Sequence, residues 1–443
     1  MMTEVLPRQT LSVRDAIALA VGIVIGVGIF RAPSAVAAEV GKPELFLGLW
    51  ALGGGLSLIR ALCYAELATT FPNVGGEYHY LRRAFGDGTA LLFGWSRAMV
   101  IQAGSIASLA YVLGDYMSVL VSLGPHSSAF YAGLSVFALT WINAKGLRLG
   151  MGIQNLLALA KLGSLVTIGL TGMALLGREG DEGGRGASVS GSLGLALVFV
   201  LYTYGGWNEV AYISAEVRDR QRGLVKALVG SIGILTALYC FVNGAYLWGL
   251  GLEGIRSSDV VAASLLEQTG ASLGRLGISV LIIVAALGAI NGTILTGART
   301  LYAMGRDFPL FASLGQWEVG RETPRRALWV QMGVVLSLIG FGAWKRHGFE
   351  TMVSYTAPVF WLFFLLTGIS LFILRWREPE VSRPFRVPLY PILPFVFCST
   401  CLYMLYASVA FAGAGAVVGL LVLLMGVPLV LMTCRRYQEA GGV

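Results

Sequence analysis

Charged residues are scarce in this sequence. Asp, Glu, Lys and Arg together make up 13% of the 443 residues, whereas hydrophobic residues make up 56%. A soluble chain of this length covers much of its surface with charged side chains, so this composition excludes a soluble protein. The sequence therefore predicts an integral membrane protein in contact with a lipid bilayer.

Histidine is almost absent. The three histidines fall in predicted loops, and no nucleophile with a neighbouring base lies in the apolar runs, so the sequence argues against a membrane-embedded enzyme. A channel is also disfavoured, because no continuous polar stripe follows the predicted helices. We expect no cofactor. The histidines are His79, His126 and His347.

Cysteine is rare as well. Cys398 and Cys401 have the spacing of metal ligands, but they form a single pair without a nearby histidine, and we interpret them as helix packing. All five cysteines lie in or beside apolar runs, so we predict no metal site and no disulfide-linked partner subunit. They are Cys63, Cys240, Cys398, Cys401 and Cys434.

Long apolar runs dominate the chain. A membrane helix needs about 20 apolar residues, and twelve runs of this kind predict an all-α fold with twelve transmembrane helices. Residues 1–13 and 434–443 lie outside the runs, and we expect no signal peptide. The spans are expected at 14–39, 45–71, 88–121, 128–144, 151–176, 192–216, 224–250, 273–305, 327–343, 349–376, 388–412 and 414–433.

Basic residues are distributed unevenly between the predicted loops. With the N-terminus inside, 21 of the 32 Lys and Arg residues fall in cytoplasmic segments and seven fall outside. This asymmetry predicts that both termini are cytoplasmic, in a bacterial plasma membrane. The net charge of +8 is explained by these loops beside anionic lipid headgroups, so no nucleic acid partner is indicated.

Three glycines interrupt the first apolar run. Gly22, Gly26 and Gly28 fall within seven residues, among β-branched side chains that form helices poorly. We expect the helix to break at Gly26-Val27-Gly28. In hydrocarbon, such a break is stable only where the freed backbone groups face a cavity that holds something polar. This stretch is therefore a candidate ligand site.

A second interruption lies five spans later. Gly205 and Gly206 fall in the middle of the run at 192–216. Because the two interrupted spans start on opposite sides of the membrane, residues 14–176 and 192–376 are expected to form an inverted repeat, with the broken helices in corresponding positions. Residues 177–191 would be an extracellular loop, and the last two spans, in 377–433, would lie outside the repeat.

Five motifs in order resemble bacterial amino acid permeases. Within the amino acid, polyamine and organocation superfamily, they most resemble the L-type amino acid transporter branch, and together they cover nearly the whole chain. The resemblance implies the LeuT-like fold and alternating access. The motifs are Gly26-Val27-Gly28-Ile29-Phe30; Cys63-Tyr64-Ala65-Glu66-Leu67 with Gly75-Gly76-Glu77-Tyr78; Tyr204-Gly205-Gly206-Trp207-Asn208; Asn291-Gly292 with Arg299, Tyr302 and Arg306; and Arg383-Pro384-Phe385-Arg386-Val387-Pro388.

Backbone groups at the two breaks suit an amino acid. The N–H groups of Val27, Gly28 and Ile29 would lie at the positive end of a helix dipole and suit a carboxylate, whereas orphan carbonyls suit an ammonium group. Similar transporters place an aromatic gate at the position of Tyr202. The complete predicted binding set is Gly22, Ile23, Gly26, Val27, Gly28, Ile29, Tyr202, Gly205, Gly206 and Asn208.

Three charged residues are candidates for gating or coupling. Glu209 is a proton carrier or a partner for Arg31, Arg97 or Asn208, since a carboxylate inside a span is costly. In similar permeases, a lysine at the position of Lys161 takes the place of a sodium ion. Glu66 belongs either to an inner charge gate with Arg14 or Arg299 or to a solvated helix end.

Arg60 departs from the family pattern, which usually shows glycine before Ala-Leu-Cys-Tyr-Ala-Glu-Leu. A guanidinium near mid-membrane costs about 2.5 to 3.5 kcal/mol on insertion scales. It would also clash where a small residue lets helices approach. We hypothesise that Arg60 is a substitution that weakens folding or slows transport.

These observations predict a secondary active transporter of small neutral L-amino acids that works by sodium-independent exchange. The exchange mode follows from the resemblance. The alternatives are a proton-coupled amino acid or polyamine importer that uses Glu209 or Lys161, and a receptor that binds without transporting. Candidate pocket side chains on other spans are Ser105, Asn291 and Tyr355.

Overall fold

The computed structural model describes residues 9–175, 192–219, 221–258, 260–268, 274–345, 348–411 and 414–440. Regular structure in these residues is helical, apart from two isolated bridges. The predicted extracellular loop at 177–191 lies outside them. The first elements are α1 (Val13–Val24), α2 (Gly28–Glu39), α3 (Pro43–Thr70), α4 (Glu77–Phe85), α5 (Asp87–Ser96), η1 (Arg97–Ile101), α6 (Gln102–Leu120), α7 (Ser127–Lys145) and α8 (Leu147–Ala174).

The second part of the chain continues the same architecture. Its elements are α9 (Leu193–Thr203), η2 (Trp207–Ile213), α10 (Arg222–Arg256), α11 (Val261–Glu267), α12 (Gly274–Asp307), η3 (Pro309–Phe311), α13 (Arg325–Lys345), α14 (Gly348–Arg377), α15 (Ile392–Phe411) and α16 (Ala414–Ala440). Here η1 is a π-helical turn, and η2 and η3 are 3-10 helices.

Eight helical segments in the described residues are long and apolar enough to cross a membrane, and the bent pair α1 and α2 gives a ninth. The protein is therefore a multi-pass membrane protein. Three other predicted spans coincide with α7, with α9 plus η2, and with α16. In the described residues, these elements do not meet the same criterion of length and apolar composition. The arrangement of twelve spans remains a prediction.

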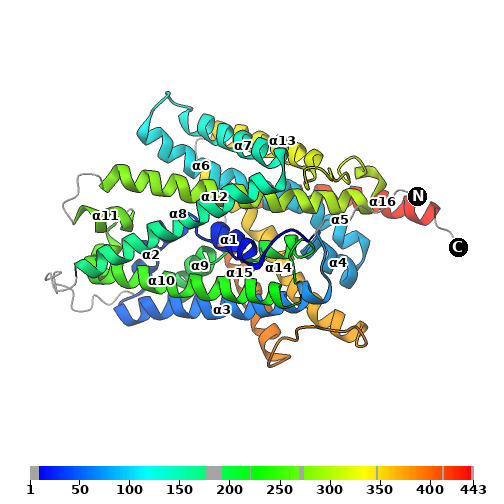
Figure 1. Cartoon of the computed structure of the whole chain (residues 1–443), viewed down its shortest axis with the longest axis horizontal. Helices are drawn as coiled ribbons and strands as arrows, with labels where there is room; N and C mark the ends of the chain where they lie inside the picture. Colours follow the sequence, from blue (N-terminus) through cyan, green and yellow to red (C-terminus); the bar gives the residue numbers. More distant parts are fainter. Residues whose placement is uncertain are drawn as a thin grey trace.

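The broken segments occupy the interior of the bundle. Figure 1 shows α1 and α9 in the middle of the molecule, surrounded by longer helices. α1 packs against α8, α10, α12 and η2, while α2 packs against α9 and α10. α15 and α16 pack mainly on α14, α3 and α5, which places them beside the bundle rather than inside it.

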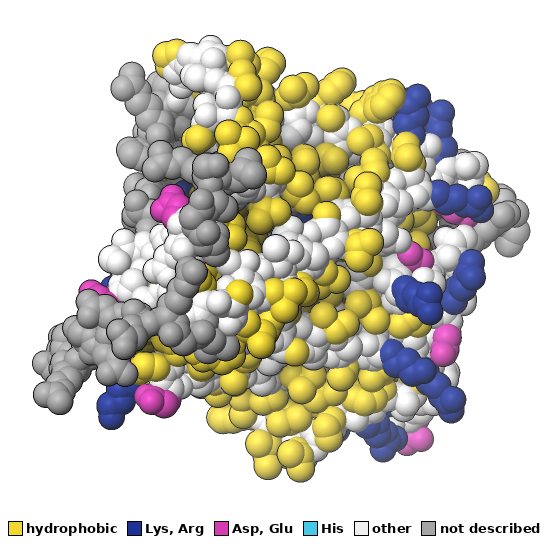
Figure 2. Space-filling view, turned by 60° about the vertical axis from the view of Figure 1, so that its left-hand side comes forward, with side chains coloured by type: hydrophobic (Ala, Val, Ile, Leu, Met, Phe, Trp, Pro, Cys, Tyr) yellow, Lys and Arg dark blue, Asp and Glu magenta, His cyan; other side chains and the backbone are white. Residues whose placement is uncertain are grey.

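Charge is concentrated at one end of the apolar body. Figure 2 shows most of the visible Lys and Arg side chains gathered at one end of a surface rich in hydrophobic side chains. α4 and the end of α16 lie at that end in Figure 1. α4 carries Arg82 and Arg83 in its last turn. The distribution agrees with a cytoplasmic face at this end, although the orientation itself remains a prediction.

Candidate functional site

The first predicted break is present. α1 ends at Val24, α2 begins at Gly28, and the two helices are bent by 50°. α1 is fixed at its start by a capping box, in which Ser12 and Asp15 exchange hydrogen bonds. The first N–H groups of α2 have no partner inside their own helix, so they are available to an anion.

The second break lies directly against the first. Gly206 adopts φ +106°, a left-handed conformation that favours glycine, and a Cβ atom there would lie 2.7 Å from Cγ2 of Ile23. Across the bundle, Tyr239 of α10 places its hydroxyl 3.1 Å from the Val24 carbonyl and 3.4 Å from the Thr203 carbonyl. Tyr239 was not predicted from the sequence, although it joins the last turns of α1 and α9.

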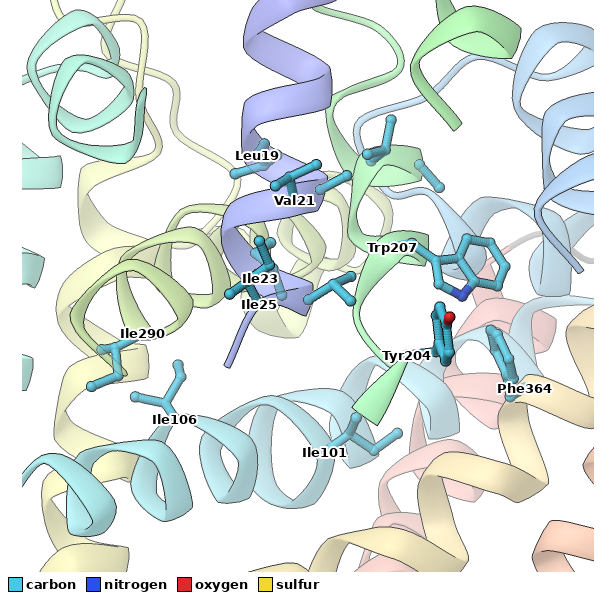
Figure 3. Packing of buried hydrophobic residues seen from close by; sticks show 14 of the residues in the cluster. Leu19, Val21, Ile23, Ile25, Ile101, Ile106, Tyr204, Trp207, Ile290 and Phe364 are labelled. Carbon is cyan, nitrogen blue, oxygen red and sulfur yellow. The ribbon is translucent and has the colours of Figure 1, made fainter. Parts of the chain in front are cut away.

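Side chains around the breaks are apolar and closely packed. In Figure 3, Ile23 and Ile25 extend from the end of α1, and Trp207, Tyr204 and Phe364 lie on the other side of the second break. The Trp207 and Phe364 rings are 5.9 Å apart. Water cannot therefore reach the freed backbone groups from these sides.

The accessible part of the breaks is small and uncharged. Tyr202 exposes 49% of its surface, although the residues on either side of it are buried. Gly205 is exposed, and Gly26 and Gly28 are half-buried. A ligand at the two breaks would therefore meet backbone groups and the phenol of Tyr202.

Lys161 of α8 reaches the first break. Its ammonium donates a hydrogen bond of 2.6 Å to the Gly22 carbonyl, and its side chain is 2% exposed. A Cβ atom at Gly288 of α12 would lie 2.7 Å from Nζ, so the ammonium sits between α1, α8 and α12. The Gly22 carbonyl, a predicted substrate contact, therefore already accepts one hydrogen bond. The role that the resemblance implies for Lys161, in place of a sodium ion, stays a prediction.

A chain of buried amides lies next to Lys161. Asn291 Nδ2 donates to Gln154 Oε1 (2.9 Å), and Asn143 Nδ2 donates to Asn291 Oδ1 (2.7 Å). Asn291, a candidate pocket residue, therefore ties α7, α8 and α12 together instead. Gln154 Nε2 has no hydrogen-bond partner among the described residues and lies against Gly22. Gln154 and Asn143 were missed because polar residues inside a span do not reveal their direction.

Glu209 forms a buried ion pair. Arg97 Nη2 donates to both of its carboxylate oxygens, at 2.9 and 2.7 Å, and the guanidinium lies 3.8 Å from the centre of the Tyr212 ring. Arg97 belongs to the π-helical turn η1, a feature frequent at functional sites. Of the partners considered, Arg97 is the one found, whereas the Arg31 guanidinium lies over the ring of Tyr116.

The partner predicted for Glu66 was wrong. Instead of Arg14 or Arg299, Arg375 donates two hydrogen bonds to its carboxylate, at 2.7 and 2.5 Å, and Arg383 lies 3.5 Å away. These residues belong to the end of α14 and the segment before α15, far along the chain. Glu66 is buried, so the solvated reading is also wrong.

Two predicted binding residues have other contacts. The Asn208 amide donates to Glu77 (2.7 Å), the first residue of α4. The Tyr355 hydroxyl donates to the Met99 carbonyl (2.9 Å), and its ring packs against Gly104. Ser105 of α6 is half-buried and remains a pocket candidate. Through its bond to Glu77, Asn208 therefore joins η2 to α4 and supports the second break.

Arg60 is enclosed by aromatic rings rather than by helix backbones. Its guanidinium carbon lies 5.9 to 6.0 Å from the ring centres of Trp207, Trp361 and Phe364, and Nη2 donates to Ser57 (2.7 Å). No carboxylate lies within 4 Å of it in the described part of the chain. The predicted clash is thus avoided, while a partly uncompensated buried charge remains.

A polar cavity of about 340 Å³ opens at the start of α1 and α8. At its wall, Asn155 Nδ2 donates to Asp15 Oδ1 (2.8 Å), linking these two helices. Its lining also includes Thr10, Arg148 and Arg218. The cavity thus lies at the end of α1 opposite to the first break.

The amino acid permease family matches residues 11–433. The b(0,+)-type amino acid transporter 1 of Rattus norvegicus is 30% identical, over 89% of this chain and 81% of that protein. The large neutral amino acids transporter small subunit 2 of Homo sapiens and the Asc-type amino acid transporter 1 of Mus musculus are each 29% identical, over 95% of this chain and 79% and 80% of those proteins. The chain therefore belongs to the amino acid permease family, a family of membrane transporters rather than enzymes, in the amino acid, polyamine and organocation superfamily.

Proposed function

We propose that this protein exchanges small neutral L-amino acids across a bacterial plasma membrane, without sodium, by alternating access. The observation that carries the proposal is the contact between two helix breaks at Ile23 and Gly206, with accessible backbone at Gly26, Gly28 and Gly205. Paired broken helices at corresponding positions support a LeuT-like fold of twelve spans with a 5+5 inverted repeat.

The two ends of an amino acid suit the two kinds of backbone group. The carboxylate would accept hydrogen bonds from the N–H groups of Val27, Gly28 and Ile29 at the start of α2. The ammonium would donate to the Ile23 carbonyl, because the Gly22 carbonyl already accepts a bond from Lys161. Tyr202 would cover the bound substrate.

The charges favour a neutral substrate and no sodium. Lys161 supplies a fixed cation between α1, α8 and α12, where a sodium ion would be repelled. Glu209 is neutralised by Arg97 and is not available to a cationic side chain, which disfavours a polyamine. The exchange mode rests on the resemblance to the L-type branch. The alternative remains a proton-coupled importer.

We also propose that no disulfide-linked subunit is attached. The four described cysteines lie inside helices, and Cys63 and Cys401 are buried. One relative is named as a small subunit, which is a statement about that protein. The predicted outer loop at 177–191 has no cysteine to form such a bond.

Counterflow in proteoliposomes tests the function. We expect radiolabelled L-alanine or L-serine to enter only when unlabelled amino acid is inside, at matched pH and without sodium. Gly206→Ala should abolish uptake, because its Cβ atom meets Ile23, whereas Gly233→Ala should not, because nothing lies within 4 Å of that position. Uptake driven by an inward proton gradient into empty vesicles would replace exchange with proton coupling, and absence of flux would overturn both.

A further inference from the structure

Four glutamates are buried near the cytoplasmic side, and one of them differs from the others. Three accept hydrogen bonds from an arginine. For Glu77, no Lys, Arg or His nitrogen lies within 4 Å in the described residues. The paired residues are Glu66 with Arg375, Glu209 with Arg97, and Glu216 with Arg299.

Neutral donors hold Glu77 in place. The Tyr64 hydroxyl and the Asn208 amide both donate to Oε1, each at 2.7 Å, and the residue is 3% exposed. A buried carboxylate with neutral partners lacks the compensation that an ion pair gives, so the protonated form is favoured. Through Asn208, the carboxyl group supports the segment that follows the second break.

A tight turn places this carboxyl group beneath η2. Gly76, the residue before it, has φ +50°, and a Cβ atom there would lie 2.8 Å from the Tyr212 ring. Both the conformation and the space therefore require glycine. Glu77 is thus fixed where α3, α4 and η2 meet, and any movement that separates them exposes it to cytoplasmic water.

Several titratable or charged groups face Glu77 from the elements around it. The positive charge of Arg97 acts on the Glu77 carboxyl from a distance, whereas the hydrogen bonds of Arg97 are donated to Glu209. Among the described residues, these groups include Tyr80 on the same helix, Tyr64 from α3, Arg97 from η1, Glu209 and Tyr212 from η2, and Cys401 from α15. Counting Arg97, Glu209 and Glu77 alone, the cluster is neutral only when one carboxyl group holds a proton.

We propose that Glu77 is a proton-binding site: its carboxyl group is protonated while the cytoplasmic side is closed, and it releases that proton to cytoplasmic water when α3, α4 and η2 separate. On closing, the carboxylate takes a proton from the same side. The proton therefore does not cross the membrane. The rate of amino acid exchange depends on cytoplasmic pH, whereas no net proton flux accompanies it.

The direction of the pH effect follows from the surroundings. Burial raises the pKa of the Glu77 carboxyl, and the Arg97 charge and the two hydrogen bonds offset part of the rise. The closed state thus binds the proton more tightly than an open, hydrated state does. Acidic cytoplasm favours the closed state, and inward opening becomes easier as the pH rises through the Glu77 pKa.

Two measurements test this inference. The first is an infrared titration of the purified protein, which detects the C=O stretch of protonated carboxyl groups. We expect a titrating band that Glu77→Gln removes and that the exposed control Glu318→Gln leaves unchanged. Tyr64→Phe deletes a donor that stabilises the carboxylate, so it should move the midpoint upward by about one pH unit or more. A band that is identical in Glu77→Gln and wild type overturns the proposal.

The second measurement is exchange in membrane vesicles whose cytoplasmic face is inside, with the internal pH varied. Below the Glu77 pKa, wild-type exchange should slow by up to about tenfold per pH unit. Glu77→Gln should be slow and independent of pH, and a wild-type pH profile in this variant overturns the proposal. This arm rests on the proposed function, whereas the infrared arm does not. If wild type shows no flux but Glu77→Gln loses the infrared band, exchange is refuted and the proton site is retained.

Discussion

Glycines interrupt both broken spans, but different contacts hold α1 and η2. α1 is fixed by apolar packing, by the bond from Lys161 to the Gly22 carbonyl and by the Asp15 contact with Asn155. η2 is fixed by the ion pair of Glu209 with Arg97 and by the bond from its Asn208 to Glu77.

Because of this difference, we expect α1 to move more easily than η2. The side-chain hydrogen bonds that hold α1 are few, and the one between Asp15 and Asn155 lies at a polar cavity, so it can be exchanged for water at modest cost. The contacts of η2 bury charges, which lose most of their stabilisation if one partner leaves. We expect α1 to move at lower cost than η2, which separates from α3 and α4 only when the cytoplasmic side opens, and the following variants test that contrast.

The largest effect is expected from breaking the η2 anchor. Arg97→Ala leaves the Glu209 carboxylate buried without a partner, which should reduce the free energy of unfolding by about 3 to 5 kcal/mol. Thermal unfolding of the detergent-solubilised protein measures this loss. Arg321→Ala, which breaks the exposed pair with Glu318, is the matched control and should change stability little. Equal melting temperatures for the two variants would show that η2 is not held by its ion pair.

Releasing α1 should affect transport more than stability. Lys161→Ala removes a charge-assisted hydrogen bond to the Gly22 carbonyl, so amino acid affinity should fall by about tenfold to a hundredfold. Binding of radiolabelled amino acid to the purified protein measures this. Lys226→Ala, at an exposed position, should bind normally. Unchanged affinity in Lys161→Ala would remove this residue from the site.

The sequence predicted the interruptions better than the anchors. Glycine content located both breaks, because glycine forms helices poorly. The partner of Glu66 and the contacts of Tyr239 and Asn143 were not predictable. Such contacts join residues far apart in the chain, and they depend on how each helix is rotated about its axis. In a span that is apolar all round, the sequence pattern does not fix that rotation.

A smaller effect is expected where α2 meets α9. A Cβ atom at Gly28 would lie 3.0 Å from the Thr203 hydroxyl oxygen, so Gly28→Ala should push the two outer helices apart slightly and slow exchange a few-fold. Gly163→Ala has open space around it and serves as the control. The double variant Gly28→Ala with Thr203→Ala should recover part of the rate. If it recovers none, the loss does not come from this contact.

The smallest effect, and the most specific one, concerns Arg60. Its guanidinium has three rings and two oxygen acceptors but no carboxylate in the described residues, so its desolvation is only partly offset. Arg60→Gly should raise the melting temperature or the uptake rate by removing that charge. Because glycine also leaves a cavity, Arg60→Met, which keeps most of the volume, should be the more stable of the two. If both variants melt below wild type, the aromatic rings stabilise the cation, and Arg60 is part of the support of Trp207 and the second break rather than a perturbing substitution.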